Sequence, residues 1–233
     1  MSSLEKVLER LDQQPGGAVV FDLDSTLFDN GPRTVRIMLE WAHHHQPQLV
    51  AGIEAMPRHR IAYSLAENAA RVEGWNEEWL ESLKAFWFKR FFADEYINFD
   101  EPVDGAPEFV RTCRARGAHV VYLTGRDVPG MWTGTCNSLR AFGFPVGVPG
   151  VELVLKPNFE MDDSVFKGNV IPQIDAYCAG GVVATFENEA KNLIVMEEAW
   201  PEAEHILLDT NWDPRHPASL RDGFAKLPDF RMR

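Results

Sequence analysis

The sequence predicts an α/β fold in which a doubly wound parallel sheet carries an inserted helical subdomain. Short apolar runs recur along the chain, and helical patterns that end at glycines separate most of them, which together predict the sheet. Residues 31–100 separate the first two runs by far more chain than one crossover needs, which predicts the insert. We therefore expect a Rossmann-like core formed by residues 1–30 and 101–233, and a helical subdomain formed by residues 31–100.

The apolar runs are the expected strands. They are short and continuous, as in strands that are buried on both faces of a parallel sheet. They cover residues 18–21, 119–123, 151–155, 182–186 and 205–208.

Helices are expected before and between these strands. Residues 1–14 place Leu4, Val7, Leu8 and Leu11 on one side of a helix. Three further helices end at or near glycines, which commonly terminate helices. They are expected over residues 108–116, 131–142 and 169–177.

The insert is bordered by residues 29–32 and 100–107, where proline and glycine indicate linkers. Within it, Asn76 is a candidate cap for a helix whose first turn is acidic. This helix carries an aromatic face, and the insert as a whole holds four of the seven tryptophans, Trp41, Trp75, Trp79 and Trp87. We expect most of these rings to form the core of the insert itself.

Composition narrows the class of protein. The net charge of −12, without a long run of Lys or Arg, argues against nucleic acid as a partner and favours a small dissociable substrate. Cys113, Cys136 and Cys178 lack paired spacing, so we expect free thiols in a reducing compartment. No apolar stretch reaches about 18 residues, so we expect a cytoplasmic protein without a membrane partner. The sequence does not define the oligomeric state.

The first strand ends in two carboxylates, Asp22 and Asp24. Side chains alternate along a strand, so both leave on the same face, toward the crevice where parallel sheets bind ligands. One carboxylate there can attack phosphorus or hold a metal ion while the other moves a proton.

Polar side chains follow the other strand ends as well. Thr124-Gly125-Arg126 offers a hydroxyl and a closely approachable amide that suit a phosphoryl oxygen. Lys167 is expected to open a helix, where its ammonium can neutralise a nucleophile and a phosphate. Glu187 and Asn188 offer oxygen atoms of the kind that a hard cation prefers. Parallel topology brings these strand ends together.

These residues resemble the four motifs of the haloacid dehalogenase-like superfamily of phosphatases, in order and strand placement, over essentially the whole chain outside the insert. The resemblance implies that Asp22 is the nucleophile and Asp24 the general acid/base. It implies that Thr124, Gly125 and Lys167 bind the phosphoryl group. It also implies a Mg²⁺ cofactor held by Asp22, the Asp24 carbonyl and the fourth motif, Glu187 and Asn188, and a helical cap formed by the insert.

Two positions leave alternatives. Lys156, directly after its strand, competes with Lys167 for the third motif, and we favour Lys167 because of its distance from the fourth motif. Asn188 stands where the family usually has aspartate, so an uncharged ligand should bind the metal more weakly, unless Glu187 or Glu189 compensates.

The leading hypothesis is a Mg²⁺-dependent phosphatase acting on a small phosphorylated metabolite. The alternatives are a phosphatase acting on 3′ ends of nucleotides or nucleic acids, suggested by the run 163–167, and a non-catalytic binding protein. Candidate cap contacts to a second anionic group of the substrate are Arg33, Arg36, Arg58 and His59, with Arg126 a minor phosphate contact. The triplet His43-His44-His45 is expected to be a solvated helix end, because consecutive helical residues point in different directions.

Overall fold

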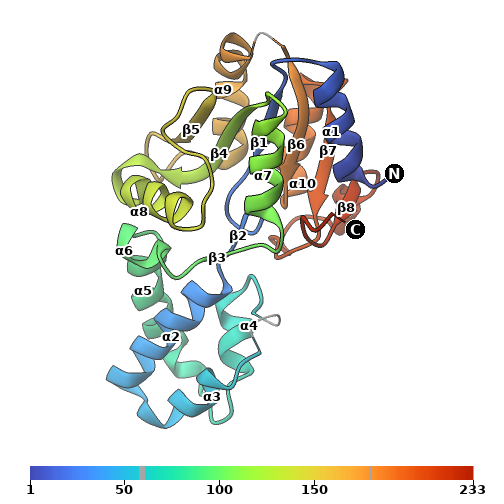
Figure 1. Cartoon of the computed structure of the whole chain (residues 1–233). Helices are drawn as coiled ribbons and strands as arrows, with labels where there is room; N and C mark the ends of the chain where they lie inside the picture. Colours follow the sequence, from blue (N-terminus) through green and yellow to red (C-terminus); the bar gives the residue numbers. More distant parts are fainter. Residues whose placement is uncertain (58–60, 179, 233) are drawn as a thin grey trace.

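The computed structural model describes residues 1–57, 61–178 and 180–232, and it shows a six-stranded parallel sheet between two layers of helices (Figure 1). The strand order is β5-β4-β1-β6-β7-β8, and every neighbouring pair in the sheet is parallel. The predicted α/β fold with a doubly wound parallel sheet is confirmed.

The five predicted strands are all present. They are β1 (Ala18–Phe21), β4 (His119–Asp127), β5 (Val151–Lys156), β6 (Val182–Glu187) and β7 (Glu204–Leu208). The sequence analysis missed β8 (Ala225–Leu227), an edge strand whose side chains are mostly exposed and therefore give no apolar run. The central strand β1 is fully buried, so its carboxyl end opens into the middle of the sheet edge.

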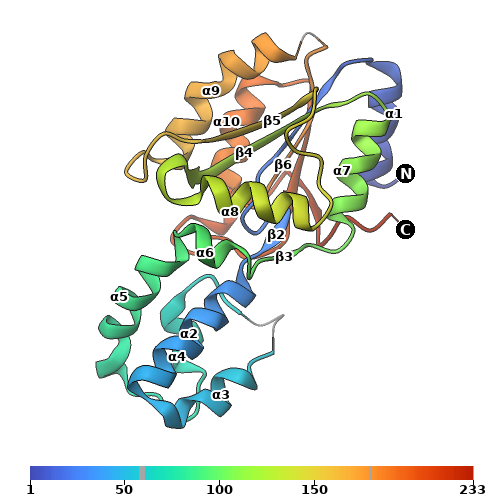
Figure 2. The same cartoon turned by 60° about the vertical axis from the view of Figure 1, so that its left-hand side comes forward.

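Helices cover both faces of the sheet (Figure 2). Side chains of α1 (Ser3–Gln13), α7 (Ala106–Ala115) and α8 (Val128–Ala141) share one hydrophobic cluster with one face of the sheet. Side chains of α9 (Asp163–Tyr177) and α10 (Ala190–Ala199) share a second cluster with the opposite face. A short 3₁₀ helix, η4 (Ala218–Arg221), precedes β8.

The α9 helix begins earlier than expected. Residues 169–177 were predicted as helical, with Lys167 opening the helix, but α9 already starts at Asp163. The cause is a side-chain cap, since Asp162 Oδ1 accepts hydrogen bonds from Ser164 N at 2.9 Å and Val165 N at 3.1 Å. Lys167 therefore lies inside the second turn of α9, where the helix holds its side chain against the sheet.

The insert is helical, and it lies at one end of the core (Figure 1). Its chain enters through β2 (Phe28–Asp29) and leaves through β3 (Glu101–Pro102), which pair antiparallel, so both linkers lie side by side. Its helices in chain order are α2 (Gly31–His45), η1 (Pro47–Leu49), α3 (Val50–Glu54), α4 (Leu65–Ala70), η3 (Glu77–Trp79), α5 (Leu80–Phe91) and α6 (Asp94–Ile97).

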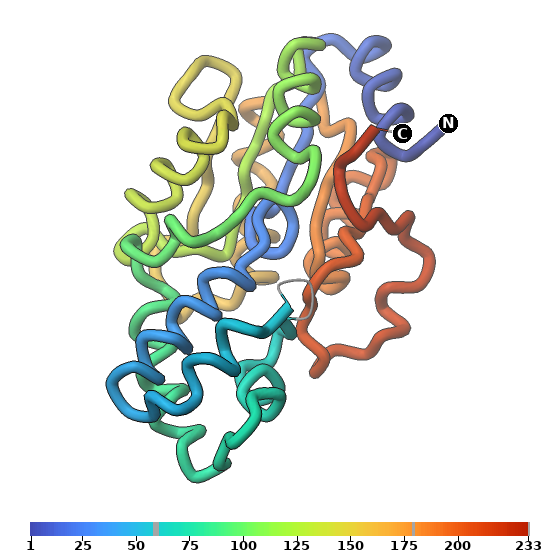
Figure 3. Tube along the Cα trace, turned by 60° about the horizontal axis from the view of Figure 1, so that its bottom comes forward, coloured from blue at the N-terminus to red at the C-terminus, as the bar shows by residue number. Residues whose placement is uncertain are grey.

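The insert has a hydrophobic cluster of its own, around the buried rings and methyl groups of Trp41, Leu49 and Leu83. It contacts the core on two sides. On one side, α6 packs against α8, and Gly134 N donates to Asp94 Oδ1 at 2.6 Å. On the other side, the segment after β7 runs beside the insert (Figure 3), and Asn211 Nδ2 donates to Ile61 O at 2.8 Å.

Among the described residues, no helix is long and apolar enough to cross a membrane.

Candidate active site

The loop after β1 is tightly folded and presents Asp22 and Asp24 at the carboxyl end of the central strand. Amides of Thr26, Leu27 and Phe28 all donate to Leu23 O. Ser25 has a φ of +59°, in the left-handed region that L residues seldom adopt. Such strained backbone is concentrated at functional sites, where the surrounding structure maintains it.

Asp22 faces a lysine and a second carboxylate inside the core. Lys167 Nζ from α9 lies 2.7 Å from Asp22 Oδ1 and 2.5 Å from Glu187 Oε2 at the end of β6. All three residues are at least 95 % buried. The sheet order brings them together, because β6 is the direct neighbour of β1 and α9 leads into β6.

This cluster holds two carboxylates for one ammonium, and the charges shift each pKa. Burial, reinforced by repulsion from Glu187, raises the pKa of Asp22 to about 8, although Lys167 opposes the shift. Burial also raises the pKa of Glu187. Burial would lower the pKa of Lys167, but the two carboxylates outweigh it and raise that pKa. With both carboxylates ionised, the cluster would carry one excess negative charge, and either a proton on Asp22 or one further cation would balance it.

Asp24 lies in a different electrostatic setting. Arg126, which follows Thr124 and Gly125, donates to Asp24 through Nε and Nη2, both at 2.8 Å. Arg33 of α2 donates to Asp24 Oδ1 at 2.9 Å. Asn30 Nδ2 donates to the same oxygen at 2.7 Å. Both carboxylate oxygens of Asp24 are therefore hydrogen-bond acceptors, and one of the donors comes from the insert.

Asp100 completes this second cluster. Its carboxylate, which is 1 % exposed, accepts from Arg33 Nε at 2.7 Å and lies 2.9 Å from Arg126 Nη2. Partial burial would raise the pKa of Asp24, but the guanidinium groups of Arg126 and Arg33 outweigh it and hold that pKa well below its usual range. The charges of the two carboxylates and the two guanidinium groups balance. The cluster connects the ends of β1 and β4 with the two ends of the insert.

Thr124 and Gly125 lie at the end of β4, the other neighbour of β1. Thr124 is fully buried, and its Oγ1 accepts from Arg126 N at 3.2 Å. A Cβ atom at Gly125 would lie 2.5 Å from the carboxylate oxygen Oδ2 of Asp163. A side chain at this position would therefore displace the Asp163 carboxylate at the start of α9.

The structure also separates the two candidate lysines. Lys156 Nζ donates to Met161 O at 2.9 Å and Phe159 O at 3.2 Å, and it pairs with Asp163 Oδ1 at 2.8 Å. These contacts hold the loop between β5 and α9. Lys167, and not Lys156, lies beside Asp22.

The residues present fit a hard divalent cation. The amide nitrogen of Asn188 donates to Asn211 O at 2.7 Å, which turns Asn188 Oδ1 toward Thr26 Oγ1, 3.3 Å away, in the loop after Asp24. Carboxylate, amide and main-chain oxygens with added waters suit Mg²⁺, and the Asp22 cluster holds two carboxylates for one ammonium. Glu187 is a poorer ligand than its sequence position suggests, since its oxygens already face Lys167 and the amides of Asn188 and Glu189.

Other candidates lie elsewhere. Arg36 pairs with Glu40 at 2.8 Å along α2, and His43, His44 and His45 form the last turn of that helix. Arg58 and His59 lie outside the described residues. Arg33 does not have a free guanidinium for a second anionic group, because it is fully buried against Asp24 and Asp100.

The sequence analysis missed Asn30 and Asp100 altogether. Their only signal was a position in the proline- and glycine-rich linkers, where a polar residue is ordinarily solvated.

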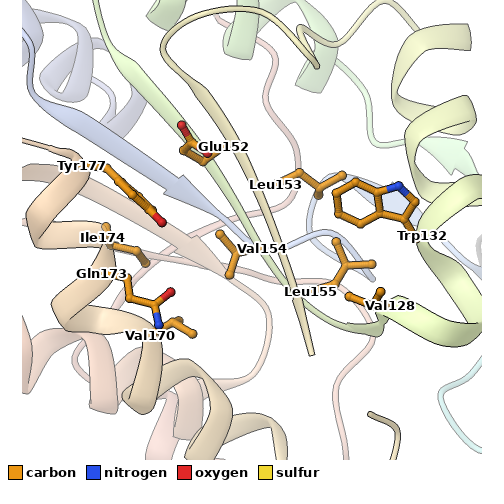
Figure 4. A pocket seen from close by; sticks show the side chains of 10 residues that line it. All are labelled: Val128, Trp132, Glu152, Leu153, Val154, Leu155, Val170, Gln173, Ile174 and Tyr177. Atoms are coloured by element: carbon orange, nitrogen blue, oxygen red, sulfur yellow. The ribbon is translucent and has the colours of Figure 1, made fainter. Parts of the chain in front are cut away.

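A separate cavity of about 240 Å³ lies along the free edge of β5, between α8 and α9 (Figure 4). Leu153 of β5 points toward Trp132 of α8 on one side of the strand, and Val154 points toward the side of α9 that carries Tyr177. None of the residues at the strand-end site lines this cavity, so it is not part of that site.

The fold and the strand-end residues define a hydrolase of the α/β class with an aspartate after its first strand. The family model of haloacid dehalogenase-like hydrolases matches residues 17–161, which is more than half of the chain, so the protein belongs to this family. No curated protein matches the sequence.

Solved structures share the fold at low sequence identity. A predicted phosphoglycolate phosphatase from Haemophilus somnus is 14 % identical with a TM-score of 0.53, over 91 % of this chain and 94 % of that one. A predicted phosphatase from Clostridium acetobutylicum is 12 % identical with a TM-score of 0.53, over 90 % and 93 %. Protein tyrosine kinase A from Mycobacterium tuberculosis is 16 % identical with a TM-score of 0.54, over 92 % and 94 %. These likenesses concern the fold.

Proposed function

We propose that the protein is a Mg²⁺-dependent phosphatase that hydrolyses a small phosphomonoester through an aspartyl-phosphate. The observation that carries the proposal is the pairing of Asp22 with Lys167 at the end of the central strand, next to Asp24. Membership of a hydrolase family supports the reaction type. The net charge of −12 favours a small substrate over nucleic acid.

In the first step, an oxygen of Asp22 attacks phosphorus, and the bond between phosphorus and the ester oxygen breaks. Lys167 keeps Asp22 oriented and offsets charge at the transferring group, while Thr124 and the Gly125 amide bind phosphoryl oxygens. The departing ester oxygen takes a proton from the Asp24 carboxyl group. For Asp24 to hold this proton, one of its carboxylate oxygens must first give up its contact with a guanidinium group.

In the second step, water attacks the phosphorus of the aspartyl-phosphate and gives a proton to Asp24. The bond between phosphorus and Asp22 breaks, which releases inorganic phosphate, restores the Asp22 carboxylate and leaves Asp24 protonated, as it was at the start of the first step. Asp22, the Asp24 carbonyl and Asn188 would hold Mg²⁺, which supplies positive charge for the phosphoryl oxygens when it is bound.

The test is phosphate release from a panel of phosphorylated metabolites, including phosphoglycolate, and from short 3′-phosphorylated oligonucleotides, with and without Mg²⁺. We expect Mg²⁺-dependent turnover of small esters that is lost in Asp22→Asn. Turnover restricted to oligonucleotide ends would show that the substrates are 3′ ends of nucleic acids and not small phosphomonoesters. A folded protein that turns over nothing, or an Asp22→Asn variant with full activity, would refute the proposal.

A further inference from the structure

Residues 79–92, which comprise the end of η3, α5 and its C-cap, have two aromatic faces, and only one of them belongs to the hydrophobic cluster of the insert. Trp79, Leu83 and Phe86 belong to the hydrophobic cluster of the insert or pack against it. Trp87, Phe88, Phe91 and Phe92 belong to none of the three hydrophobic clusters of the described residues. The expectation that the rings of the insert form its own core therefore does not hold for this second face.

These four rings contact one another and one ring of the core. Trp87 stacks on Phe91 with ring centroids 4.2 Å apart, and Phe91 and Phe92 meet edge to face at 5.1 Å. Phe159, in the loop between β5 and α9, lies 4.8 Å from Phe92 and 5.4 Å from Phe88. We name Trp87, Phe88, Phe91, Phe92 and Phe159 the aromatic wall.

The aromatic wall touches both sides of the strand-end site. At one end, the Arg33 guanidinium lies 4.3 Å from the centre of the Phe91 ring and 2.9 Å from Asp24 Oδ1. At the other end, Lys156 Nζ lies 5.6 Å from the centre of the Phe159 ring and pairs with Asp163, whose carboxylate lies against Gly125. The wall is thus connected to Asp24 through Arg33, and to Gly125 through Lys156 and Asp163.

Part of this apolar surface is open. Phe88 is 52 % exposed and Phe159 is 39 % exposed, although they contact each other. The contact between α6 and α8 holds the wall in place: a Cβ atom at Gly134 would collide with the main chain of Asp94. Exposed rings fixed beside a reactive centre offer stacking and edge contacts to a planar apolar group.

We infer that the aromatic wall binds an aromatic group on the ester side of the substrate, so that the preferred phosphomonoesters carry a phenyl ring or a nucleobase. This inference rests on the proposed function, because it places that group beside Asp24, which would protonate the departing ester oxygen. The phosphorus and the bonds that form and break are those of the two steps above. A nucleobase and a phenyl ring share the planar π face that the wall recognises.

The experiment compares kcat/KM for two esters that differ in aromaticity but leave as similar alcohols, benzyl phosphate and cyclohexylmethyl phosphate. A second pair, uridine 5′-monophosphate and ribose 5-phosphate, tests the contribution of a nucleobase in the same way. We expect the protein to prefer the aromatic member of at least one pair by about tenfold, which is the size of one or two stacking contacts. Phe88→Leu and Phe159→Leu, which keep apolar volume, should reduce that preference about threefold or more.

Phe99→Leu is the matched control, because Phe99 is an exposed ring of the insert, 38 % exposed, outside the aromatic wall. It should leave the preference unchanged. Equal turnover of both members of both pairs would overturn the inference while the proposed function stands.

Binding of benzylphosphonate, a non-hydrolysable probe, to Asp22→Asn separates the two proposals if nothing is hydrolysed. Binding that weakens in the double variants Asp22→Asn/Phe88→Leu and Asp22→Asn/Phe159→Leu would retain the aromatic site and reject the phosphatase. Absence of binding, or binding that neither substitution changes, would reject the aromatic site.

Discussion

Asp22 and Asp24 are two residues apart, yet they belong to clusters of different construction. Core elements alone surround Asp22: Lys167 comes from α9 and Glu187 from β6. Asp24 is held across the junction with the insert, by Arg33 of α2 together with Arg126 and Asp100. The first cluster holds two carboxylates for one ammonium, whereas the second holds two carboxylates and two guanidinium groups.

The difference matches the roles that we propose for the two carboxylates. A nucleophile profits from a rigid setting that does not change when the insert moves, and the Asp22 cluster has that property. A residue that must take up and release a proton works better when its hydrogen-bond donors can move away. One donor to Asp24, Arg33, lies in the insert. Substitutions in the two clusters should therefore have different consequences.

The largest effect is expected for Lys167→Met. The substitution leaves Asp22 and Glu187 buried without their cation, and breaking a buried pair typically costs about 3–5 kcal/mol of unfolding free energy. Urea unfolding measures the loss, and turnover should disappear. The control is Asp22→Asn, which removes one of the two competing carboxylates and should abolish turnover with little loss of stability. Equal destabilisation by the two variants would contradict the charge excess assigned to this cluster.

The same contrast explains what the sequence could predict. Asp22, Thr124 and Gly125 follow apolar runs, and parallel topology alone brings strand ends together, so their arrangement was predictable, whereas Lys167 reaches Asp22 from the second turn of α9. The partners of Asp24 were not. Arg33 and Asp100 lie 67 positions apart, and their contact depends on the pairing of β2 with β3, which consist of two residues each.

Which face of α5 is buried was equally hidden. Rings at successive turns of a helix indicate an apolar helix but do not show which neighbour covers each face. Trp79 at the end of η3 packs against the hydrophobic cluster of the insert, whereas Trp87 in α5 lies outside that cluster and stacks on Phe91.

Asp100→Asn tests the second cluster. The variant keeps the shape of the side chain but leaves two buried guanidinium groups with one carboxylate, and we expect a loss of about 2 kcal/mol in unfolding free energy. Turnover should fall because Arg33 no longer has a fixed position beside Asp24. A double-mutant cycle with Arg33→Met measures the coupling between Arg33 and Asp100. If the two substitutions prove additive, the two residues do not act as one unit.

Gly134→Ala perturbs the junction from a distance. The new methyl group would collide with the main chain of Asp94, so α6 must move away from α8. Overpacking lowers the unfolding free energy by about 1–3 kcal/mol, whereas replacing a helical glycine with alanine raises it by up to about 1 kcal/mol. The net loss of unfolding free energy should therefore be about 1 kcal/mol. Gly168→Ala is the matched control, because its methyl group would meet only Val195 at 3.5 Å.

The Gly134→Ala variant should impair turnover while Gly168→Ala should not, since only the former moves the insert that carries Arg33. Hydrogen exchange along α2 and α9 reports which cluster is disturbed. Faster exchange in α9 with unchanged α2 would contradict the assignment of the junction to Asp24.

The smallest effect is expected from His205, which lies outside both clusters and serves as a reference for pH dependence. Its Nδ1 accepts from Thr185 Oγ1 at 2.8 Å, and its Nε2 donates to Trp200 O at 3.0 Å, so both ring nitrogens are satisfied in the neutral form. Burial lowers the pKa of His205. As the pH falls below about 6.5, the unfolded chain takes up this proton before the folded protein does, and stability decreases.

Urea unfolding of the protein and of His205→Gln at pH 7.5 and 5.5 isolates this contribution, which the variant should lose. Any decrease in stability at pH 5.5 that remains in His205→Gln then belongs to other titratable groups. The same comparison in Asp22→Asn and Asp100→Asn examines the two carboxylate clusters first. Identical pH dependence with and without His205 would show that its protonation does not contribute.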